Sequence, residues 1–204
     1  MLRRLSIAAA IMLPALFMAG ANANAAPARI TPRVDAIGPG DWCGEQTQLC
    51  LRDPSDGGAG TTVLASRKSE SDAEDWKLVR DTGRCPDAKV SSSCPGGWIS
   101  SHYVNATIFV LKNVGQGSLC IRTSAATQYV AKMGACDTGN ELSSAFLAFT
   151  VEGVPGAWVF ESVDASNALG QFEWLTGGNS NDSTVFDKPG VPITALSEWQ
   201  LISS

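Results

Sequence analysis

The sequence contains a single histidine, His102, and this scarcity limits the catalytic chemistry that it can support. Nucleophilic catalysis by serine or cysteine needs a base held beside the nucleophile. A lone histidine flanked by Ser101 and Tyr103 reads most simply as a surface residue. The acids that could form a glycosidase pair gather in residues 70–75, where solvated loop carboxylates are expected. No Gly-rich phosphate-binding motif opens a helix. We therefore predict that the protein is not an enzyme.

Clustered metal ligands and an excess of basic residues are also missing. A structural zinc site typically uses paired Cys-x-x-Cys spacings, and no two cysteines of this chain stand so close together. Lysine and arginine total 15 against 20 acidic residues, which gives a formal net charge of -5. Nucleic acid and anionic lipid both attract basic patches, so an acidic chain is a poor match for either. We expect no metal, no cofactor and no nucleic-acid partner.

A long apolar run is absent too, although a short one opens the chain. Residues 1–4 include two arginines, residues 5–19 are almost wholly apolar around Pro14, and an Ala-x-Ala exit follows. A membrane-spanning helix needs about 20 apolar residues, whereas this three-part pattern is typical of a secretory signal. We predict a signal peptide at residues 1–26 and a secreted mature chain, extracellular or periplasmic, with no membrane span. An uncleaved anchor is the alternative.

Six cysteines follow the predicted signal: Cys43, Cys50, Cys85, Cys94, Cys120 and Cys136. An even number of cysteines in an exported chain favours disulfides. The sequence alone cannot choose among the possible connectivities. Spacing along the chain favours the local pairs, which are Cys43–Cys50, Cys85–Cys94 and Cys120–Cys136.

The clearest pattern in the mature chain is a run of alternating strands between Phe109 and Val151. Gly-rich turns punctuate the alternation, which is typical of β-hairpins. The same outline occurs once before and once after, and each copy closes on an aromatic residue: Trp76, Phe149 and Trp199. Repeats of about 40 to 50 residues indicate a repeated structural unit. We predict an all-β fold of three four-stranded units that close into a barrel with a triangular cap, each giving one aromatic to a shared core.

The predicted domain plan follows from this repeat. Residues 27–40 read as an extended lead-in, and residues 41–204 as a single domain. Residues 80–101 form a Cys-bearing insertion between the first and second units. Structureless loops of this length are uncommon and often functional. We interpret this one as a surface decoration, with a binding role as the alternative. In the third unit, we expect a turn at residues 164–167 and a strand at residues 169–175.

The arrangement resembles the β-trefoil of the ricin B-chain lectin family over nearly the whole mature chain. Two segments match the family's Cys-Leu strand, Leu49-Cys50-Leu51 and Leu119-Cys120-Ile121. Cys136 matches its second cysteine, and the three closing aromatics match the tryptophan of its Gln-x-Trp motif. The resemblance implies a β-trefoil with pseudo-threefold symmetry that binds carbohydrate. In that family, an aspartate after the Cys-Leu pair and a polar pair near the closing tryptophan grip sugar hydroxyls, while an aromatic ring stacks on the sugar's apolar face.

Every unit departs from the family's sugar-binding pattern. The aspartate position reads Arg52, Arg122 and Gly170 in the three units. The glutamine position of the closing motif reads Glu74, Leu147 and Ser197, and the platform position of the second unit falls near Gly134. No standard galactose pocket can therefore be carried over, and any sugar site must be atypical.

The third unit is the first choice for an atypical sugar site. It has Gln171 and Trp174 near Asn179, and Phe186 stands where a platform ring could lie. An aromatic ring with a few amides is the minimum for a shallow sugar site. The plainer interpretation is that Trp174 belongs to the core and the amides are turn residues. The first unit offers two acids without a stacking ring, Asp53 and Asp56.

We therefore predict a secreted, non-catalytic binding protein, with a glycan as the first expected partner. The alternative is a protein-interaction β-trefoil that captures an extracellular protein through residues 84–98, either as a protease inhibitor or as the carrier subunit of an exported toxin. A structural surface protein with no soluble ligand is a third interpretation. A glycan array separates the first hypothesis from the others. Deletion of the insertion should abolish protein capture with the fold intact if the second is right.

Overall fold

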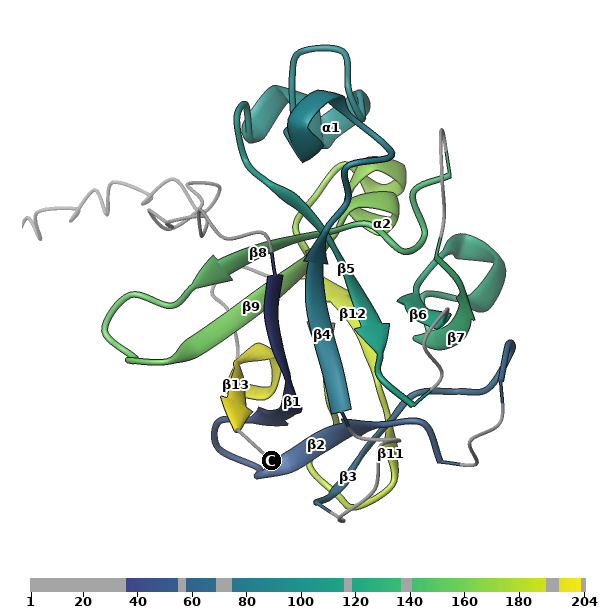
Figure 1. Cartoon of the computed structure of the whole chain (residues 1–204), viewed down its shortest axis with the longest axis vertical. Coiled ribbons are helices and arrows are strands. Elements are labelled where there is room, and N and C mark those ends of the chain that lie inside the picture. The colour runs from purple at the N-terminus through teal and green to yellow at the C-terminus, as the bar shows by residue number, and fades with distance from the viewer. Residues whose placement is uncertain are drawn as a thin grey trace, which may run out of the picture.

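The computed structural model describes residues 36–54, 58–68, 75–115, 119–136, 141–189 and 195–202. The predicted signal peptide at residues 1–26 and most of the predicted lead-in lie outside these residues. Within the described part, no helix is both long enough and apolar enough to cross a membrane. Strands dominate the molecule, and two short helices, α1 and α2, lie together at one end of it (Figure 1).

The strands fall into three successive units. The first unit contains β1 (Ala36–Gly44), β2 (Leu49–Arg52), β3 (Leu64–Arg67) and β4 (Asp75–Arg80). The second contains β5 (Ile108–Asn113), β6 (Leu119–Arg122), β7 (Lys132–Ala135) and β8 (Phe146–Thr150). The third contains β9 (Ala157–Ser162), β10 (Glu173–Thr176), β12 (Phe186–Pro189) and β13 (Trp199–Ile202), with a short β11 (Ser183–Thr184) that pairs with β3. The helices are α1 (Gly97–His102) and α2 (Val163–Leu169), with 3-10 turns at Pro86–Ala88, Ala125–Thr127 and Ala195–Ser197.

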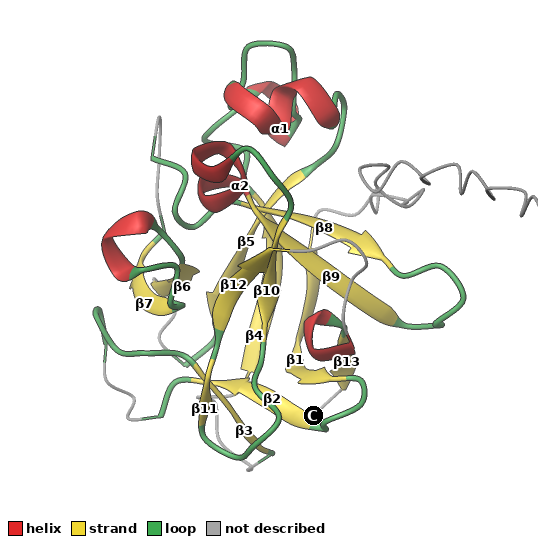
Figure 2. Cartoon of the chain, turned by 180° about the vertical axis from the view of Figure 1, so that it is seen from behind, coloured by secondary structure: helices red, strands yellow, loops and turns green. Residues whose placement is uncertain are grey.

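The first and last strands of the units form a closed barrel. Antiparallel pairings run from β1 to β4, β5, β8, β9 and β13, and β13 pairs back with β1. The inner strands of each unit form hairpins, β2–β3, β6–β7 and β10–β12. Closing the sheet in this way leaves the barrel strands without a free edge. Figure 2 shows the same barrel from behind, with α1 and α2 together at one end.

A ring of backbone hydrogen bonds joins the three hairpins. The Val63 amide donates to the Ala131 carbonyl at 2.9 Å, the Ala131 amide to the Val185 carbonyl at 2.9 Å, and the Val185 amide to the Val63 carbonyl at 3.1 Å. The three side chains are fully buried. Each unit therefore places the same kind of residue at the same point around a common axis. The predicted β-trefoil with pseudo-threefold symmetry is confirmed.

The inner core contains one closing aromatic from each unit, but one of them differs from the prediction. The Trp76 indole donates to the Leu51 carbonyl at 2.8 Å, and the Trp199 indole donates to the Leu175 carbonyl at 2.9 Å. Their counterpart in the second unit is Phe146, which is fully buried in the same cluster. Phe149 is buried too, but it lies in a second cluster. Side chains alternate between the two faces of a strand, so residues three positions apart on β8 point to opposite sides.

The second hydrophobic cluster lies outside the barrel, beneath the insertion and α2. It joins residues of the insertion to outward-facing barrel residues: Cys85, Val90, Ile99, Ala106, Ile108, Ala145, Leu147, Phe149, Val159, Val163, Phe172 and Trp174. The insertion is therefore part of a core and not a surface decoration. Deleting it would expose Ile108 and Phe149, so we now expect such a deletion to destabilise the fold.

Two further boundaries differ from the sequence-based expectation. Residues 163–169 form helix α2, where a turn and the start of a strand were expected. The Ser162 hydroxyl accepts a hydrogen bond from the Ala165 amide at 3.4 Å and caps the helix at its start. Gly170, at a φ of 66°, ends it in the left-handed conformation that favours glycine. Strand β1 begins at Ala36, inside the stretch expected to lead up to the domain.

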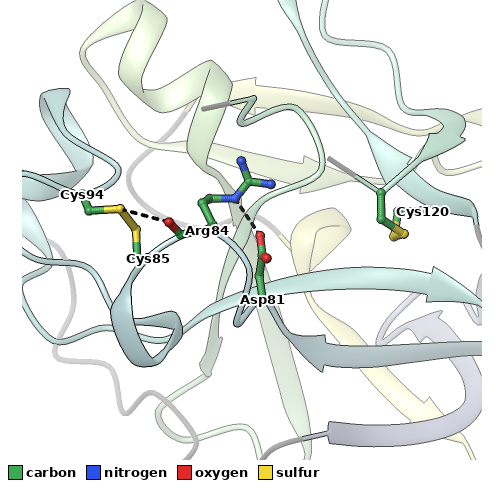
Figure 3. Close-up of polar contacts among 6 residues, drawn as sticks. Asp81, Arg84, Cys85, Cys94 and Cys120 are labelled. Atoms are coloured by element: carbon green, nitrogen blue, oxygen red, sulfur yellow. Dashed lines mark hydrogen bonds and ion pairs between the residues drawn. A yellow bond between two sulfur atoms is a disulfide. The ribbon is translucent and has the colours of Figure 1, made fainter. Parts of the chain in front are cut away.

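All six cysteines are paired, in the combination that local spacing favoured. The disulfides are Cys43–Cys50, Cys85–Cys94 and Cys120–Cys136. The second of these closes the insertion. Figure 3 shows how the backbone beside it is held: Arg84 forms a buried ion pair with Asp81, with a distance of 2.6 Å from Nε to Oδ2. The Arg84 carbonyl lies 3.7 Å from the Cys94 sulfur.

Candidate ligand-binding site

A small pocket opens where α1 meets the turn between α2 and β10. Its volume is about 130 Å³. Five residues line it: Trp98, His102, Gly170, Gln171 and Phe172. Trp98 comes from the insertion and His102 directly follows it, whereas the others come from the third unit. The pocket therefore exists only because the insertion packs against that unit.

Aromatic rings form most of the pocket wall. The His102 ring stacks on the Trp98 indole with centroids 4.0 Å apart and an interplanar angle of 23°. Phe172 meets the same indole edge to face at 4.8 Å and 86°. Beneath it, Phe172 stacks on the buried Trp174 at 5.9 Å and 7°. Offset-stacked and edge-to-face contacts are the preferred arrangements of aromatic pairs, so the wall is anchored in the second core.

Helix α2 holds α1 in place. The Asn167 side-chain oxygen accepts a hydrogen bond from the Ile99 amide at 2.8 Å. Gly97 has a φ of +65°, and a Cβ at this position would lie 2.7 Å from the same Asn167 oxygen. Only glycine fits this close approach without strain. Ile99 is fully buried beneath the helix. These contacts fix the position of Trp98, which stands between Gly97 and Ile99 in the chain.

The polar groups of the pocket are partly committed to the protein itself. His102 Nδ1 lies 2.8 Å from the Trp98 carbonyl oxygen. Because a carbonyl can only accept, this nitrogen carries the hydrogen, and Nε2 of the neutral ring is an acceptor. The Gln171 amide nitrogen donates to the Glu173 carboxylate at 2.7 Å, and the Gly170 amide donates to the Ser166 carbonyl at 2.9 Å.

Acidic groups lie behind this wall. Glu173 is 1% exposed; burial raises the pKa of its carboxyl, and the hydrogen bond from Gln171 opposes that shift. Burial also raises the pKa of Asp187 to about 8, with smaller contributions from Glu173 and Asp164 in the same direction. The pKa of Tyr129 is raised by burial and by these same three carboxyl groups. Burial therefore favours the uncharged forms of the Glu173 and Asp187 carboxyl groups.

The predicted site residues are dispersed. Gln171 alone lines the pocket. Trp174 is 2% exposed and lies beneath Phe172. Asn179 is exposed in the loop after β10, and Phe186 pairs with Thr176 on the neighbouring strand. Of the two acids proposed in the first unit, Asp53 is 1% exposed and Asp56 lies outside the described residues.

The register of the hairpins changes two of the motif positions assigned from sequence. Leu175 occupies the place of Leu51 beside the closing tryptophan, so the aspartate position of the third unit falls on Thr176 and not on Gly170. Because Phe146 closes the second unit, the glutamine position there falls on Ser144 and not on Leu147. At Gly134 an added Cβ would lie 2.4 Å from Cδ of Arg122, so this side chain covers the platform position of the second unit.

Sequence reasoning missed three lining residues: Trp98, His102 and Phe172. Trp98 was at the edge of the loop suspected of protein capture, and His102 was considered only as a catalytic base. The signal available was an aromatic after two glycines in the insertion. Within the described residues, no group of three or more His, Cys, Asp or Glu side chains could hold a metal ion.

Comparison with known proteins supports the fold. No family model and no curated protein matches the chain. A solved structure described as the BEL beta-trefoil has a TM-score of 0.57 and 10% identity, covering 85% of this chain and 100% of its own. An agglutinin of Rhizoctonia solani has a TM-score of 0.51 and 15% identity, covering 82% of this chain and 97% of its own. A mosquitocidal holotoxin has a TM-score of 0.57 and 12% identity over 82% of this chain, which corresponds to 18% of the holotoxin chain. At such identities the likeness establishes the fold alone, and that fold is the β-trefoil.

Proposed function

We propose that the protein is an exported, non-catalytic carbohydrate-binding β-trefoil protein whose site is the pocket between α1 and the α2–β10 turn. The observation that carries this proposal is the partly exposed Trp98 indole, held rigidly in the pocket wall beside the polar groups of His102 and Gln171. An indole face packs well against the apolar face of a sugar ring, while polar groups at its edge orient the hydroxyls.

The size of the pocket favours a small ligand. Sites for drug-sized molecules typically enclose about 300–1,000 Å³, whereas this pocket measures about 130 Å³. A single sugar ring at the end of a glycan, partly exposed to solvent, suits this volume. Three disulfides support an oxidising compartment, which agrees with the signal peptide expected from the sequence.

The geometry around His102 supports binding without catalysis. The Ser101 hydroxyl lies 2.9 Å from His102 Nδ1, a distance that a nucleophile–base pair would have. However, both groups are directed to the Trp98 carbonyl, the hydroxyl at 2.7 Å and the ring nitrogen at 2.8 Å. Because that nitrogen carries the hydrogen, it cannot take the proton of the serine. Hydrolysis of a glycan or peptide that disappears in His102→Ala would contradict this part of the proposal.

A glycan array followed by calorimetric titration of the best ligand tests the proposal. Trp98→Ala should weaken binding about two- to twelvefold, because an aromatic stacking contact contributes roughly 0.5–1.5 kcal/mol beyond its buried area. Val104→Ala is the matched control, since Val104 is 59% exposed shortly after the insertion and does not line the pocket. A wild-type protein that binds no saccharide ends the proposal. A Trp98→Ala variant that binds like the wild type would place the site elsewhere.

Two exposed apolar side chains beside the pocket favour a second candidate, capture of an extracellular protein such as a protease or a toxin subunit. Val104 follows α1 and is 59% exposed, and Leu169 ends α2 and is 46% exposed. The double variant Val104→Ser, Leu169→Ser should abolish capture of such a partner and leave saccharide binding unchanged. Equal capture by the variant and the wild type in a binding assay would reject this role.

A further inference from the structure

The wall of the pocket favours a neutral ligand group. Its five lining residues include no lysine, arginine, aspartate or glutamate. Glu173 lies behind the wall and is 1% exposed, and burial raises the pKa of its carboxyl, which favours the uncharged form. A charged substituent that entered the pocket would lose hydration without gaining an opposite charge, which is unfavourable.

The lining keeps both hydrogen-bond donors and acceptors for a ligand. Gln171 gives one of its two amide hydrogens to Glu173 at 2.7 Å, which leaves the second hydrogen and the amide oxygen. His102 Nδ1 donates to the Trp98 carbonyl, so Nε2 of the neutral ring is an acceptor. Among the described residues, none accepts a hydrogen bond from the Trp98 indole N–H. A ligand group that satisfies this lining must therefore both donate and accept.

The indole N–H is accessible because the residue beside it is a glycine. A Cβ added at Gly170 would lie 4.0 Å from Trp98 Cδ1, the ring carbon bonded to the indole nitrogen. Gly170 has no side chain to cover this edge of the ring, and it lines the pocket itself. The residue that ends α2 in the left-handed conformation thus also leaves the indole donor open to a ligand.

The remainder of the lining is apolar, and the space is small. Phe172 is packed between Trp98 and Trp174, with ring centroids at 4.8 and 5.9 Å, so it provides an apolar wall and not a free stacking face. Sites for drug-sized molecules enclose about 300–1,000 Å³, whereas this pocket measures about 130 Å³. It suits one substituent of a sugar better than a whole ring. A hydroxyl would satisfy the polar atoms but leave the aromatic wall without an apolar partner.

We propose that the pocket receives the acetamido group of an N-acetylated sugar, and that the protein therefore selects N-acetylhexosamines over the parent hexoses and the free amino sugars. This inference rests on the proposed carbohydrate binding and names the substituent that the same site takes. The acetamido oxygen accepts from the Trp98 indole, and the acetamido N–H donates to His102 Nε2 or to the Gln171 oxygen. The methyl group packs against the aromatic wall, and the sugar ring stays at the mouth of the pocket.

The test compares methyl glycosides of the gluco and galacto series that differ only at carbon 2. The substituent is N-acetyl, N-formyl, N-butanoyl, ammonium or hydroxyl. In calorimetric titration at neutral pH, the N-acetyl member should bind about fourfold more tightly than the N-formyl member, which lacks one methyl group. It should bind about tenfold more tightly than the hydroxyl and ammonium members, which also lose amide hydrogen bonds. The N-butanoyl member should bind more weakly than the N-acetyl one, because its two further carbons overfill the pocket.

A conservative variant tests the role of the indole donor. Trp98→Phe keeps a ring and removes the N–H, so affinity for the N-acetyl member should fall about two- to twelvefold while affinity for the hydroxyl member stays unchanged. Trp158→Phe is the matched control, because it makes the same change at a partly buried tryptophan that packs against the inner cluster. This control should keep the wild-type preference. An equal loss of affinity for both members in Trp98→Phe would show a purely structural role and overturn the assignment of the donor.

The outcomes distinguish this inference from the function on which it rests. Equal binding of the N-acetyl and hydroxyl members, weakened in Trp98→Ala, would overturn the selectivity and leave carbohydrate binding in place. Binding of the N-butanoyl member as tight as that of the N-acetyl member would show that the acyl group lies outside the pocket, and would overturn the inference. Preference for the ammonium member would overturn it as well. Binding of no saccharide at all would overturn both proposals.

Discussion

The two hydrophobic clusters of this protein are built in different ways. The inner cluster repeats: Trp76, Phe146 and Trp199 occupy equivalent places, and the three units supply matching residues around one axis. The outer cluster occurs once, where the insertion covers the second and third units. The repeated cluster determines the fold, and the unrepeated one creates the pocket. A search for function in a symmetric fold should therefore begin where the symmetry fails.

The same contrast appears at single positions of the hairpins. Cys50 pairs with Cys43 across β1 and β2, and Cys120 pairs with Lys112 in the corresponding place. In the third unit that place is taken by Trp174, opposite Glu161. Two units carry a disulfide cysteine there, and the third packs a tryptophan under Phe172. The ring that supports the pocket thus replaces a covalent link found in the other units.

The largest effect on stability is expected from a change of pH. The group responsible is Asp187, a buried acid on β12 in the third unit. Burial raises the folded-state pKa of Asp187 to about 8 from its ordinary value of 3.8. Between these values the folded state holds a proton that the unfolded state has lost. The contribution of this group to the free energy of unfolding is therefore complete below the unfolded-state pKa. It falls as pH rises toward the folded-state pKa, by up to about 1.4 kcal/mol per pH unit. The shift of Glu173 has the same sign.

Denaturant unfolding at several pH values between about 4 and about 8 measures this dependence. Asp187→Asn should flatten it, because the amide has no proton to lose. Glu152→Gln, an exposed acid, should keep the wild-type slope. The same slope in Asp187→Asn and in the wild type would show that Asp187 is not the group responsible.

Removing a tryptophan from each cluster tests the comparison directly. Trp199→Ala should cost roughly 3–5 kcal/mol of unfolding free energy, because it opens a cavity in the repeated core and removes the hydrogen bond to Leu175. Trp174→Ala should cost a similar amount at most, but ligand binding should fall with it because Phe172 loses its support. Equilibrium unfolding and ligand titration of both variants give the measurement. Unchanged ligand binding by folded Trp174→Ala would break the link between the outer cluster and the pocket.

A smaller effect is expected at the disulfide of the insertion. Paired serine substitutions at Cys85 and Cys94 should cost about 2–3 kcal/mol, since the loop that this disulfide closes is short. Ligand affinity should fall several-fold, because Trp98 follows the second cysteine closely. The matched control carries Cys43→Ser and Cys50→Ser. It removes a disulfide that closes a loop of similar length away from the pocket. That control should lose stability without losing ligand affinity. An equal loss of affinity in both double variants would contradict the link between the Cys85–Cys94 disulfide and the pocket.

The sequence predicted the repeated parts of the molecule better than the unrepeated ones. The three units, the barrel and the disulfides leave local signals of alternation, turn residues and cysteine spacing. The closing aromatic of the second unit was missed because Phe146 and Phe149 stand on the same strand and only their facing separates them. Helix α2 was missed because it is short. The mixed apolar and polar residues between its cap at Ser162 and its end at Gly170 are equally compatible with a turn.

The pocket could not be predicted because its parts meet through tertiary contacts. Trp98 and Phe172 are distant in the chain, and the bond from Ile99 to Asn167 brings them together. Neither residue lies in a position that the lectin motif marks. Gln171 was selected for its chemistry, and the structure places it in the pocket wall, whereas Trp174 was selected as a ligand contact and lies in the core.

The circular set of bonds among Val63, Ala131 and Val185 has a consequence for how the molecule comes apart. Each of these residues donates a hydrogen bond to one neighbour and accepts one from the other. If any single unit unfolds, one of the two remaining units is left with an unpaired buried donor and the other with an unpaired buried acceptor. Partial melting is penalised on both sides at once. Heating should therefore take all three repeats apart in one step, with calorimetric and van't Hoff enthalpies in agreement.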